Sequence, residues 1–331
     1  MNSFGNIFRV HIFGESHGEC VGIIIDGVPA GLAFTEENLL PDLERRKGGL
    51  QKGTTPRQEA DYPIFKSGIF NGKSTGFPLT ILFENNNFRS EDYQEQRAIP
   101  RPGHADWVAH QKFGGNEDYR GGGHFSARLT TGIVAAGAIA KMLIPQIIIS
   151  AKVISIGGET DLEKGLQNAI DAKDSVGGIV ECKVTGLPVG LGEPYFNSLE
   201  SMLSHIMFSI PAVRGIEFGT GFQAANMFGS EHNDAIENNE GKTITNHAGG
   251  IVGGISNGNE LVFRLAIKPT SSTPKNQQSL NWETGEVEDF SIKGRHDLCV
   301  ALRAPVIVEA ATALVLVDCM MYEQLIPRII K

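Results

Sequence analysis

Residues 101–128, RPGHADWVAHQKFGGNEDYRGGGHFSAR, combine histidines, arginines and acidic residues with a run of three glycines, a mixture too polar for a buried core. Because glycine tolerates positive φ, the run can turn backbone N–H groups toward an anion. Ser126 follows the run at the start of an apolar helical pattern, as a candidate N-cap whose helix would point its positive end at a phosphate. The glycines alone favour an ordinary loop, but the charged and titratable residues beside them favour an anion-binding site, namely Arg101, His104, Asp106, Arg120 and His124.

A second polar cluster, GESHG at residues 14–18, ends a strand-like apolar run. We expect this turn to expose His17, whose imidazole can donate or accept a proton near neutral pH. Neighbouring residues of a strand point to opposite faces, so Ser16 and His17 are not expected to act as a nucleophile and its base. The cluster therefore favours a general acid, with a turn histidine bonded to backbone as the alternative.

Two later segments also carry groups that suit binding and proton transfer. Residues 268–274, KPTSSTP, place Lys268 and several hydroxyls after a strand-like run, where they could hold a phosphate or a heteroaromatic ring edge. Residues 294–297, GRHD, place Arg295 near Asp297, which suits anion binding and proton transfer. A Ser/Thr-rich loop and a salt-bridged turn are the respective alternatives. The glycine pairs of residues 249–254 do not precede a helix and give no support to a Rossmann site.

The chain has 331 residues and a formal net charge of −9, which argues against non-specific nucleic-acid binding. Clustered arginines in an acidic protein suit a small, multiply charged metabolite. The four cysteines are far apart and show no metal-ligand spacing, so we expect reduced thiols, no metal and a cytoplasmic location. No secretory signal is expected, and the most apolar late stretch, residues 304–317, contains Glu309 and is too short to span a membrane.

Strands and helices must hold these groups in place, and the apolar periodicity predicts that the two alternate along the chain. No linker is evident, so we expect a single domain over residues 1–331. Thr35 is a candidate helix N-cap, and Pro305 suits the first turn of the last helix. We expect strands at 7–13, 21–25, 62–70, 77–83, 147–156, 178–184, 215–219 and 261–267, and helices at 35–47, 126–145, 162–172, 198–208 and from 305 onward.

One internal echo is visible, because residues 25–32, IDGVPAGL, match residues 184–191, VTGLPVGL, at four positions. A strand precedes and a helix follows each copy. Chance recurrence of turn residues is the alternative. The echo favours an α+β fold with an internal pseudo-two-fold repeat, a β-α-β sandwich in which two antiparallel sheets enclose a helical layer.

Six motifs follow one another along the chain, namely GESHG, RPGHAD, RGGGHFSAR, NHAGGIVGGIS, KPTSST and GRHD. Together they resemble the chorismate synthase family, from about Phe8 to the final helix. The resemblance implies the fold of that family and a lyase that converts 5-enolpyruvylshikimate 3-phosphate to chorismate by anti-1,4-elimination of phosphate and a ring proton. It also implies a need for reduced FMN, although the reaction has no net redox change.

The resemblance further implies roles for individual residues. His17 would be the general acid beside the substrate phosphate, His104 would keep the reduced flavin correctly protonated, and Asp297 near the flavin N5 would help to relay the ring proton. The positions that match the family's FMN-binding segments are His124, Phe125, Ser126, Pro211, Ala212, Gly253, Lys268, Pro269, Thr270, Ser271, Ser272 and Arg295. Those that match anion-binding positions for the substrate or NADPH are Arg46, Lys52, Arg101, Arg128 and Arg303.

The chain departs from the family pattern where many members have arginine in place of His124 or Lys52 and proline in place of Leu298. The resemblance implies a homotetramer that takes FMN reduced by a separate flavin reductase, with NADPH as an indirect reductant. Two other functions stay open, an NADPH-dependent flavin reductase and a flavin- or anion-binding protein without catalysis.

Overall fold

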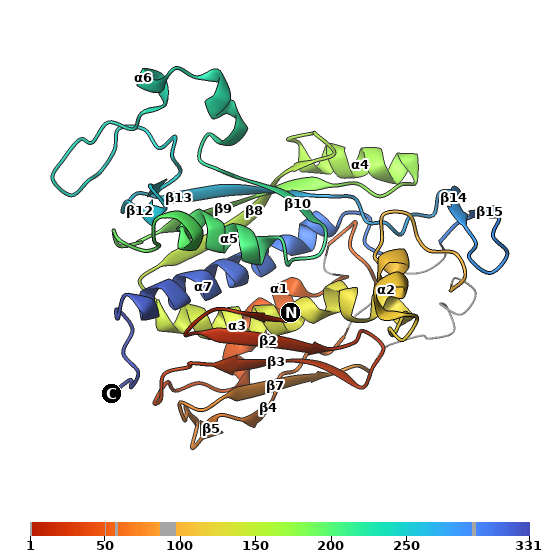
Figure 1. Ribbon diagram of the computed structural model, residues 1–331, viewed down its shortest axis with the longest axis horizontal. Coiled ribbons are helices and arrows are strands. Elements are labelled where there is room, and N and C mark those ends of the chain that lie inside the picture. Colours follow the sequence, from red (N-terminus) through yellow and green to blue (C-terminus); the bar gives the residue numbers. More distant parts are fainter. Residues whose placement is uncertain (1, 50, 57–58, 87–96, 293–295) are drawn as a thin grey trace.

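Two antiparallel sheets lie on either side of a helical layer in the computed structural model, which describes residues 2–49, 51–56, 59–86, 97–292 and 296–331 (Figure 1). The first sheet has the order β1-β2-β3-β7-β4 and the second β10-β13-β9-β8. The strands of the first are β1 (Ser3–Phe4), β2 (Arg9–Gly14), β3 (Cys20–Asp26), β7 (Leu79–Glu84) and β4 (Ile64–Ser67). Those of the second are β10 (Val213–Phe218), β13 (Leu261–Ile267), β9 (Gly178–Thr185) and β8 (Ile148–Ile156).

The helical layer is built around α3 (Thr130–Leu143) and α7 (Ala304–Tyr322), which pack against each other and each against one sheet. Small residues make this close packing feasible, because a Cβ placed on Gly137 of α3 would lie only 2.3 Å from the Cβ of Ala310. Shorter helices, α1 (Leu40–Arg46) after η1 (Glu36–Leu39) and α5 (Leu199–Met207), complete the layer. Both long helices therefore bury nearly all their apolar side chains.

The length of α7, together with the turn before it, corrects the prediction that the late apolar stretch is too short to span a membrane. Val300–Tyr322 is long and apolar enough to cross a membrane, with a hydropathy of 2.0, whereas the sequence pattern predicts too short a stretch. Within the most apolar window, 78% is buried inside the protein, so core packing accounts for this composition. The sequence pattern underestimates the length because it ends the stretch at residue 317, while the buried helix continues over Asp318 and Cys319.

Most predicted elements are confirmed, with shifts of a few residues at their ends. The predicted helix at 35–47 is divided into η1 and α1, with Thr35 as N-cap and Pro41 in the first turn of α1. The predicted strand at 62–70 contains β4 and β5 (Ile69–Phe70), and β5 pairs with β6 (Lys73–Ser74). Ser126 is an N-cap, but of η4 (Ala127–Leu129), which leads into α3.

Some elements are absent from the predictions. The polar segment 101–128 contains α2 (Asp106–Phe113) and the irregular turn η3 (Arg120–Phe125). A hairpin of β14 (Gln277–Leu280) and β15 (Val287–Phe290) lies beside α2 (Figure 1). The other unpredicted elements are η5 (Tyr195–Asn197), η6 (Gly221–Asn226), α6 (Gly229–His232), β11 (Ile251–Val252), β12 (Ile255–Ser256) and η7 (Val300–Arg303), whereas α4 (Leu162–Ala172) is the predicted helix at 162–172.

Candidate active site

The glycine run packs against the turn that carries His17. Gly121, Gly122 and Gly123 all have positive φ, at 59°, 84° and 52°. A Cβ on Gly121 would lie 2.0 Å from His17 Cε1, and the Ser16 amide donates to the Gly123 carbonyl at 3.1 Å. The glycines are needed here because a side chain would collide with the imidazole.

This packing corrects two expectations. His17 is 3% exposed, so the prediction of an exposed turn histidine was wrong: the glycine run, distant in sequence, covers its ring. Residues 101–128 are also less exposed than their polarity suggests, since Arg101 and Arg128 are 9% and 6% exposed. Both guanidinium groups have carboxylate partners, which is what allows charged groups to be buried.

The cavity next to this turn, called the arginine cavity below, has a volume of about 170 Å³. Five cationic side chains and three carboxylates line it, so it has an excess of positive charge inside an acidic chain. Such a site attracts a small polyanion. The lining residues are Arg46, Lys47, Gly48, Thr55, Glu59, Asp61, Arg101, Gly121, Ser126, Ala127, Arg128, Thr270, His296, Asp297 and Arg303.

Asp61 holds two of these arginines together. Its Oδ2 accepts from Arg46 Nη2 at 2.6 Å, and its Oδ1 accepts from Arg128 Nη1. Burial lowers the pKa of Arg46 to about 10, which leaves it protonated at neutral pH. Burial would raise the pKa of Asp61, but the charges of Arg46 and Arg128 outweigh it and hold that pKa below its usual value.

Arg303 and Asp297 form the next part of the wall. Arg303 Nη1 donates to Asp297 Oδ2 at 3.0 Å, and the Thr55 amide donates to Asp297 Oδ1 at 2.8 Å. Arg303 Nε also donates to the backbone carbonyl of Arg46 at 3.0 Å. Asp297, and Arg303 at the start of α7, thus contact Thr55 and Arg46, which lie 242 and 257 residues away in the sequence.

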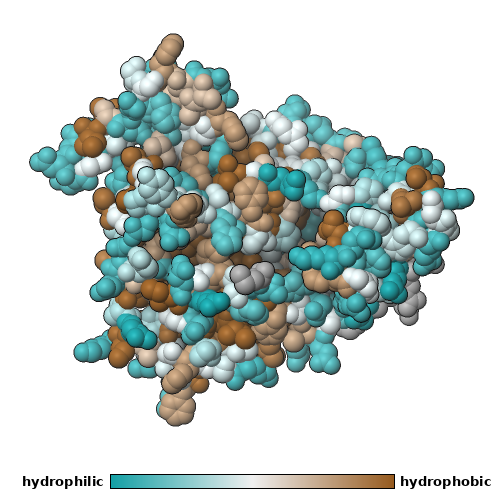
Figure 2. Space-filling view, viewed as in Figure 1, coloured by the Kyte–Doolittle hydropathy of each residue, from teal (hydrophilic) through white to brown (hydrophobic). Residues whose placement is uncertain are grey.

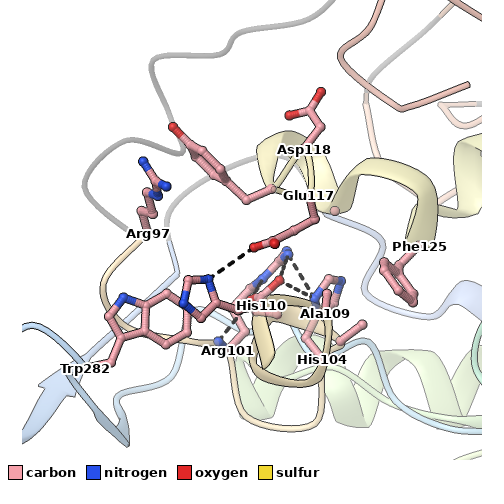
Figure 3. A pocket seen from close by; sticks show the side chains of 13 residues that line it. Arg97, Arg101, His104, Ala109, His110, Glu117, Asp118, Phe125 and Trp282 are labelled. Atoms are coloured by element: carbon pink, nitrogen blue, oxygen red, sulfur yellow. Dashed lines mark hydrogen bonds and ion pairs between the residues drawn. The ribbon is translucent and has the colours of Figure 1, made fainter. Parts of the chain in front are cut away.

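A second cavity, of about 40 Å³ and called the tryptophan cavity below, shares Arg101 with the first. Figure 3 shows Arg101 and His104 side by side, with His110 against Trp282 on the other side. Asp106 links the first pair, since its Oδ1 lies 2.6 Å from His104 Nδ1 and its Oδ2 accepts from Arg101 Nε at 2.7 Å. Burial opposes ionisation of Asp106, but hydrogen bonds from Arg101 and His104 prevail and keep its pKa well below the usual value.

The KPTSST segment is tied to the loop that carries His104. Lys268 Nζ and Ser271 Oγ both donate to the Gly103 carbonyl, at 2.7 and 2.8 Å. Arg101 Nη1 donates to Ser272 Oγ at 3.4 Å, and Thr270 lines the arginine cavity. Segments 165 or more residues apart thus form one site.

Unsatisfied polar atoms at the arginine cavity are consistent with an anionic ligand. Among the described residues, Arg46 Nε and Thr270 Oγ1, on residues that line this cavity, and Ser16 Oγ, beside the lining residue Gly121, are buried and have no hydrogen-bond partner. Leaving a buried donor unpaired is costly, so such atoms mark places where a ligand or water bonds. An arginine and two hydroxyls suit phosphate or carboxylate oxygens.

Some predicted residues do not reach either cavity. Lys52 donates to Gln167 Oε1 at 2.9 Å instead, and His124 Nδ1 lies 2.8 Å from the Gly14 carbonyl. Gly253 lies in the turn between β11 and β12, far along the second sheet from α2 (Figure 1). The Ala212 carbonyl accepts from the Lys268 amide and so touches the site only through that residue.

The positions of the remaining predicted residues follow from the same contacts. Phe125 lines the tryptophan cavity, and Pro269 lies near Gly177 and lines neither cavity. Pro211 precedes Ala212 at the start of β10, outside the lining of both cavities. Arg295 lies outside the described residues.

Several lining residues escaped the sequence analysis, among them Lys47 and Asp61. Lys47 adjoins Arg46, so proximity to a predicted residue was an available signal. Asp61 stands in the segment EADYP, where no local pattern marks it.

Comparisons with known proteins agree over the whole chain. The family model described as chorismate synthase matches residues 8–321. A chorismate synthase of Chitinophaga pinensis is 64% identical over 332 residues and covers 100% of both chains. One of Archaeoglobus fulgidus is 43% identical over 359 residues, covering 99% of each. A crystal structure of a chorismate synthase superposes with a TM-score of 0.73 at 26% identity, covering 96% of this chain and 93% of the other.

Proposed function

The chain belongs to the chorismate synthase family, and from this premise we propose how its residues divide the work of the reaction. It is a lyase of the shikimate pathway that acts in aromatic amino-acid biosynthesis. The reaction removes phosphate and a ring proton from 5-enolpyruvylshikimate 3-phosphate in an anti-1,4-elimination. The observation that carries our assignment is the buried, positively charged arginine cavity with its unpaired Arg46 Nε.

The arginines bind the substrate anions. Arg46, Arg101, Arg128 and Arg303 converge on one cavity, so a phosphate and two carboxylates can each meet a guanidinium. Asp61 and Asp297 pair with these cations and fix their directions. Binding energy from several charged contacts would orient the ring for elimination.

We assign proton transfer to His17 and Asp297. His17 does not itself line the arginine cavity, but its imidazole packs against Gly121, which does, so we propose that the glycine run shifts to let His17 protonate the departing phosphate. Asp297 lines the same cavity, where it takes part in removal of the ring proton. Hydrogen bonds from the Thr55 amide and from Arg303 fix the orientation of its carboxyl group.

The family needs a reduced flavin, and we propose FMN. When bound, reduced FMN would supply electron density to the substrate while phosphate leaves. His104 and Phe125 line the tryptophan cavity, and Ser126 lines the arginine cavity, which shares Arg101 with it. The Lys268–Ser272 segment is bonded to the loop that carries His104, through Lys268 and the Gly103 carbonyl. The unpaired Thr270 Oγ1 and the cationic Lys268 suit a phosphorylated cofactor. We propose that a separate reductase supplies the reduced flavin, with NADPH as an indirect reductant.

An anaerobic assay tests the function. With chemically reduced FMN and 5-enolpyruvylshikimate 3-phosphate, we expect stoichiometric phosphate and chorismate without net flavin oxidation. Flavin oxidation coupled to NADPH consumption, without phosphate release, would support the flavin reductase instead. Binding of FMN with neither product would support a storage protein. Replacement of His17 by alanine should lower kcat by about 10²-fold or more, as expected for loss of a general acid.

We also propose that the two halves are internal repeats within one domain. The strand order β2-β3-β7-β4 in the first sheet corresponds to β8-β9-β13-β10 in the second, and a helix follows β7 and β13 in turn. The echoed turns support this, since Gly27 and Gly186 have φ of 83° and 81°. A pseudo-two-fold sandwich with a shared helical layer follows from such a repeat.

The family resemblance leads us to propose a homotetramer in the cytoplasm. The segment 219–250 projects from the body of the protein (Figure 1), and Figure 2 shows hydrophobic side chains on it. Phe222, Phe228, Ile236 and Ile244 are 82%, 79%, 72% and 69% exposed. Exposed apolar groups of this size favour contact with another subunit. The four cysteines are free, which suits a reducing compartment.

A further inference from the structure

We propose that Asn85 is a positioning residue that orients the His17 turn and connects it to the substrate-binding arginines. Asn85 touches neither cavity and acts through other residues. The proposal rests on the role given above to His17.

The side chain of Asn85 uses both its donors and its acceptor oxygen on two parts of the site. It directly follows β7 and is 5% exposed. Its Nδ2 donates to the carbonyls of Glu15 and Gly18, at 3.0 and 2.9 Å. Its Oδ1 accepts from Arg128 Nε at 3.0 Å. These partners fix the amide orientation, because two carbonyls require the NH₂ group and a guanidinium requires the oxygen.

The two carbonyls are the ends of the turn that carries His17. The Gly18 amide donates to the Glu15 carbonyl at 3.1 Å, so residues 15–18 form a tight turn. Asn85 holds this turn from one side. The glycine run holds it from the other, through the Ser16 amide and the contact of Gly121 with the imidazole. The position of the His17 ring therefore depends on both supports.

Asn85 also joins the turn to a continuous network of charged groups. Arg128 pairs with Asp61, Asp61 with Arg46, and the Arg46 carbonyl accepts from Arg303. Arg303 then pairs with Asp297. Asn85 therefore connects the turn that carries His17, the proposed acid, to the groups that bind the substrate anions.

Asn85→Asp removes one of the two contacts of the side chain and keeps the other. The aspartate has the same shape and still accepts from Arg128, but it has no donors and places negative charge beside two carbonyl oxygens. If Asn85 positions His17, kcat should fall by about 10²-fold, the lower end of a general acid's contribution, while KM for the substrate changes little. Asn85→Ala removes both contacts, so kcat should fall and KM should rise.

A double variant shows whether Asn85 acts through His17. In a His17→Ala background, Asn85→Asp should cause no further loss of kcat, since two residues that act as one unit are non-additive. A full additional loss would overturn the proposal. Asn85→Ala in the same background provides a second measurement of kcat without placing a charge in the protein interior. The proposal can therefore be tested even if the aspartate variant folds poorly.

Asn116→Asp is a matched control. Asn116 Nδ2 also donates to two backbone carbonyls, those of Phe113 and Gly114 at 3.0 and 3.3 Å, outside both cavities. This variant should retain kcat and KM. An equal loss in both aspartate variants, or an unchanged kcat in Asn85→Asp, would refute the inference. If His17→Ala itself keeps full kcat, the proposed function of His17 fails, which is a different result.

Discussion

Asp61 balances the charge of the arginine cavity. It is buried between Arg46 and Arg128, and its φ of 50° lies in the left-handed region that residues with a side chain seldom adopt. Such a backbone conformation costs free energy and persists where surrounding contacts enforce it. Both arginines would be isolated buried charges without this carboxylate.

Replacing Asp61 by alanine should therefore destabilise the protein by about 3–5 kcal/mol, the usual cost of removing one partner of a buried ion pair. Chemical denaturation followed by circular dichroism measures the change. Glu159→Ala removes an exposed ion pair with Lys164, at 3.0 Å, and should cost less than about 1 kcal/mol. Equal effects of the two substitutions would contradict the importance given to Asp61.

Buried carboxylates such as Asp61 make the free energy of unfolding dependent on pH. Burial would raise the pKa values of Asp61, Asp106 and Glu309, but their cationic partners outweigh it and hold all three below their usual values. A carboxyl whose pKa is lower in the folded state stabilises it above the unfolded pKa, about 4, and loses that contribution as pH falls.

We expect the thermal midpoint to vary little between about pH 8 and 5 and to fall steeply below about pH 4. Glu309→Gln should be less stable at pH 7 and should show a shallower acid decline, because Arg45 and Lys141 lose a carboxylate partner. Scanning calorimetry of both proteins across this range measures the difference. Parallel pH curves for the two would show that Glu309 contributes nothing.

For individual residues, the sequence predicted the cationic side chains of the site better than the polar side chains that orient them. Arg46, Arg101 and Arg128 stand in motifs, and all three line the arginine cavity. Asp61 and Asn85 stand in segments without a pattern, and their partners are 15 or more residues away. Only the folded structure shows that these polar side chains share buried contacts.

Among the elements, α3 and α7 depend on small residues for their close approach. A Cβ on Gly137 would lie 2.3 Å from Ala310 Cβ and 2.4 Å from its Cα, so an alanine there must push the helices apart. The start of α7 carries Arg303, which means that this packing also positions part of the site.

Gly137→Ala should destabilise the protein by up to about 2 kcal/mol, because the steric cost, at most about 3 kcal/mol, is partly offset by a helix-propensity gain of about 1 kcal/mol. Gly229→Ala is the control, since Gly229 begins the helix α6 and a Cβ added there would have no neighbouring atom within 4 Å. That variant should be neutral or slightly more stable in urea denaturation. A stabilised Gly137→Ala protein would show that the helix interface is loose.

The elements with clear periodicity and caps were predictable. The helix at 162–172 and the strand at 261–267 match α4 and β13 at both ends, and the Asp161 side chain caps α4 by accepting from the Lys164 amide. The helix α2 was missed because it lacks an apolar stripe: in Asp106–Phe113 only Ala109 is buried. Tertiary contacts with Trp282 hold it in place instead.

For the molecule as a whole, the projecting segment 219–250 is hard to explain in a single subunit. Its aromatic side chains Phe222 and Phe228 are exposed, while Asp234 accepts hydrogen bonds from the amides of His247 and Ala248 and so holds the segment in shape. An ordered projection with apolar side chains costs solvation free energy unless another surface covers it. We therefore propose that this segment contacts a neighbouring subunit.

The double substitution Phe222→Ser and Phe228→Ser should shift the proposed tetramer to smaller species, because it removes two large apolar groups from the contact while leaving the core of each subunit intact. Sedimentation velocity at several concentrations measures the shift, and circular dichroism checks that each subunit stays folded. Phe77→Ser, at a residue 74% exposed on the first-sheet side, should leave assembly unchanged. A stable monomer of the unaltered protein, or a double variant that sediments as before, would rule out this role for the projection.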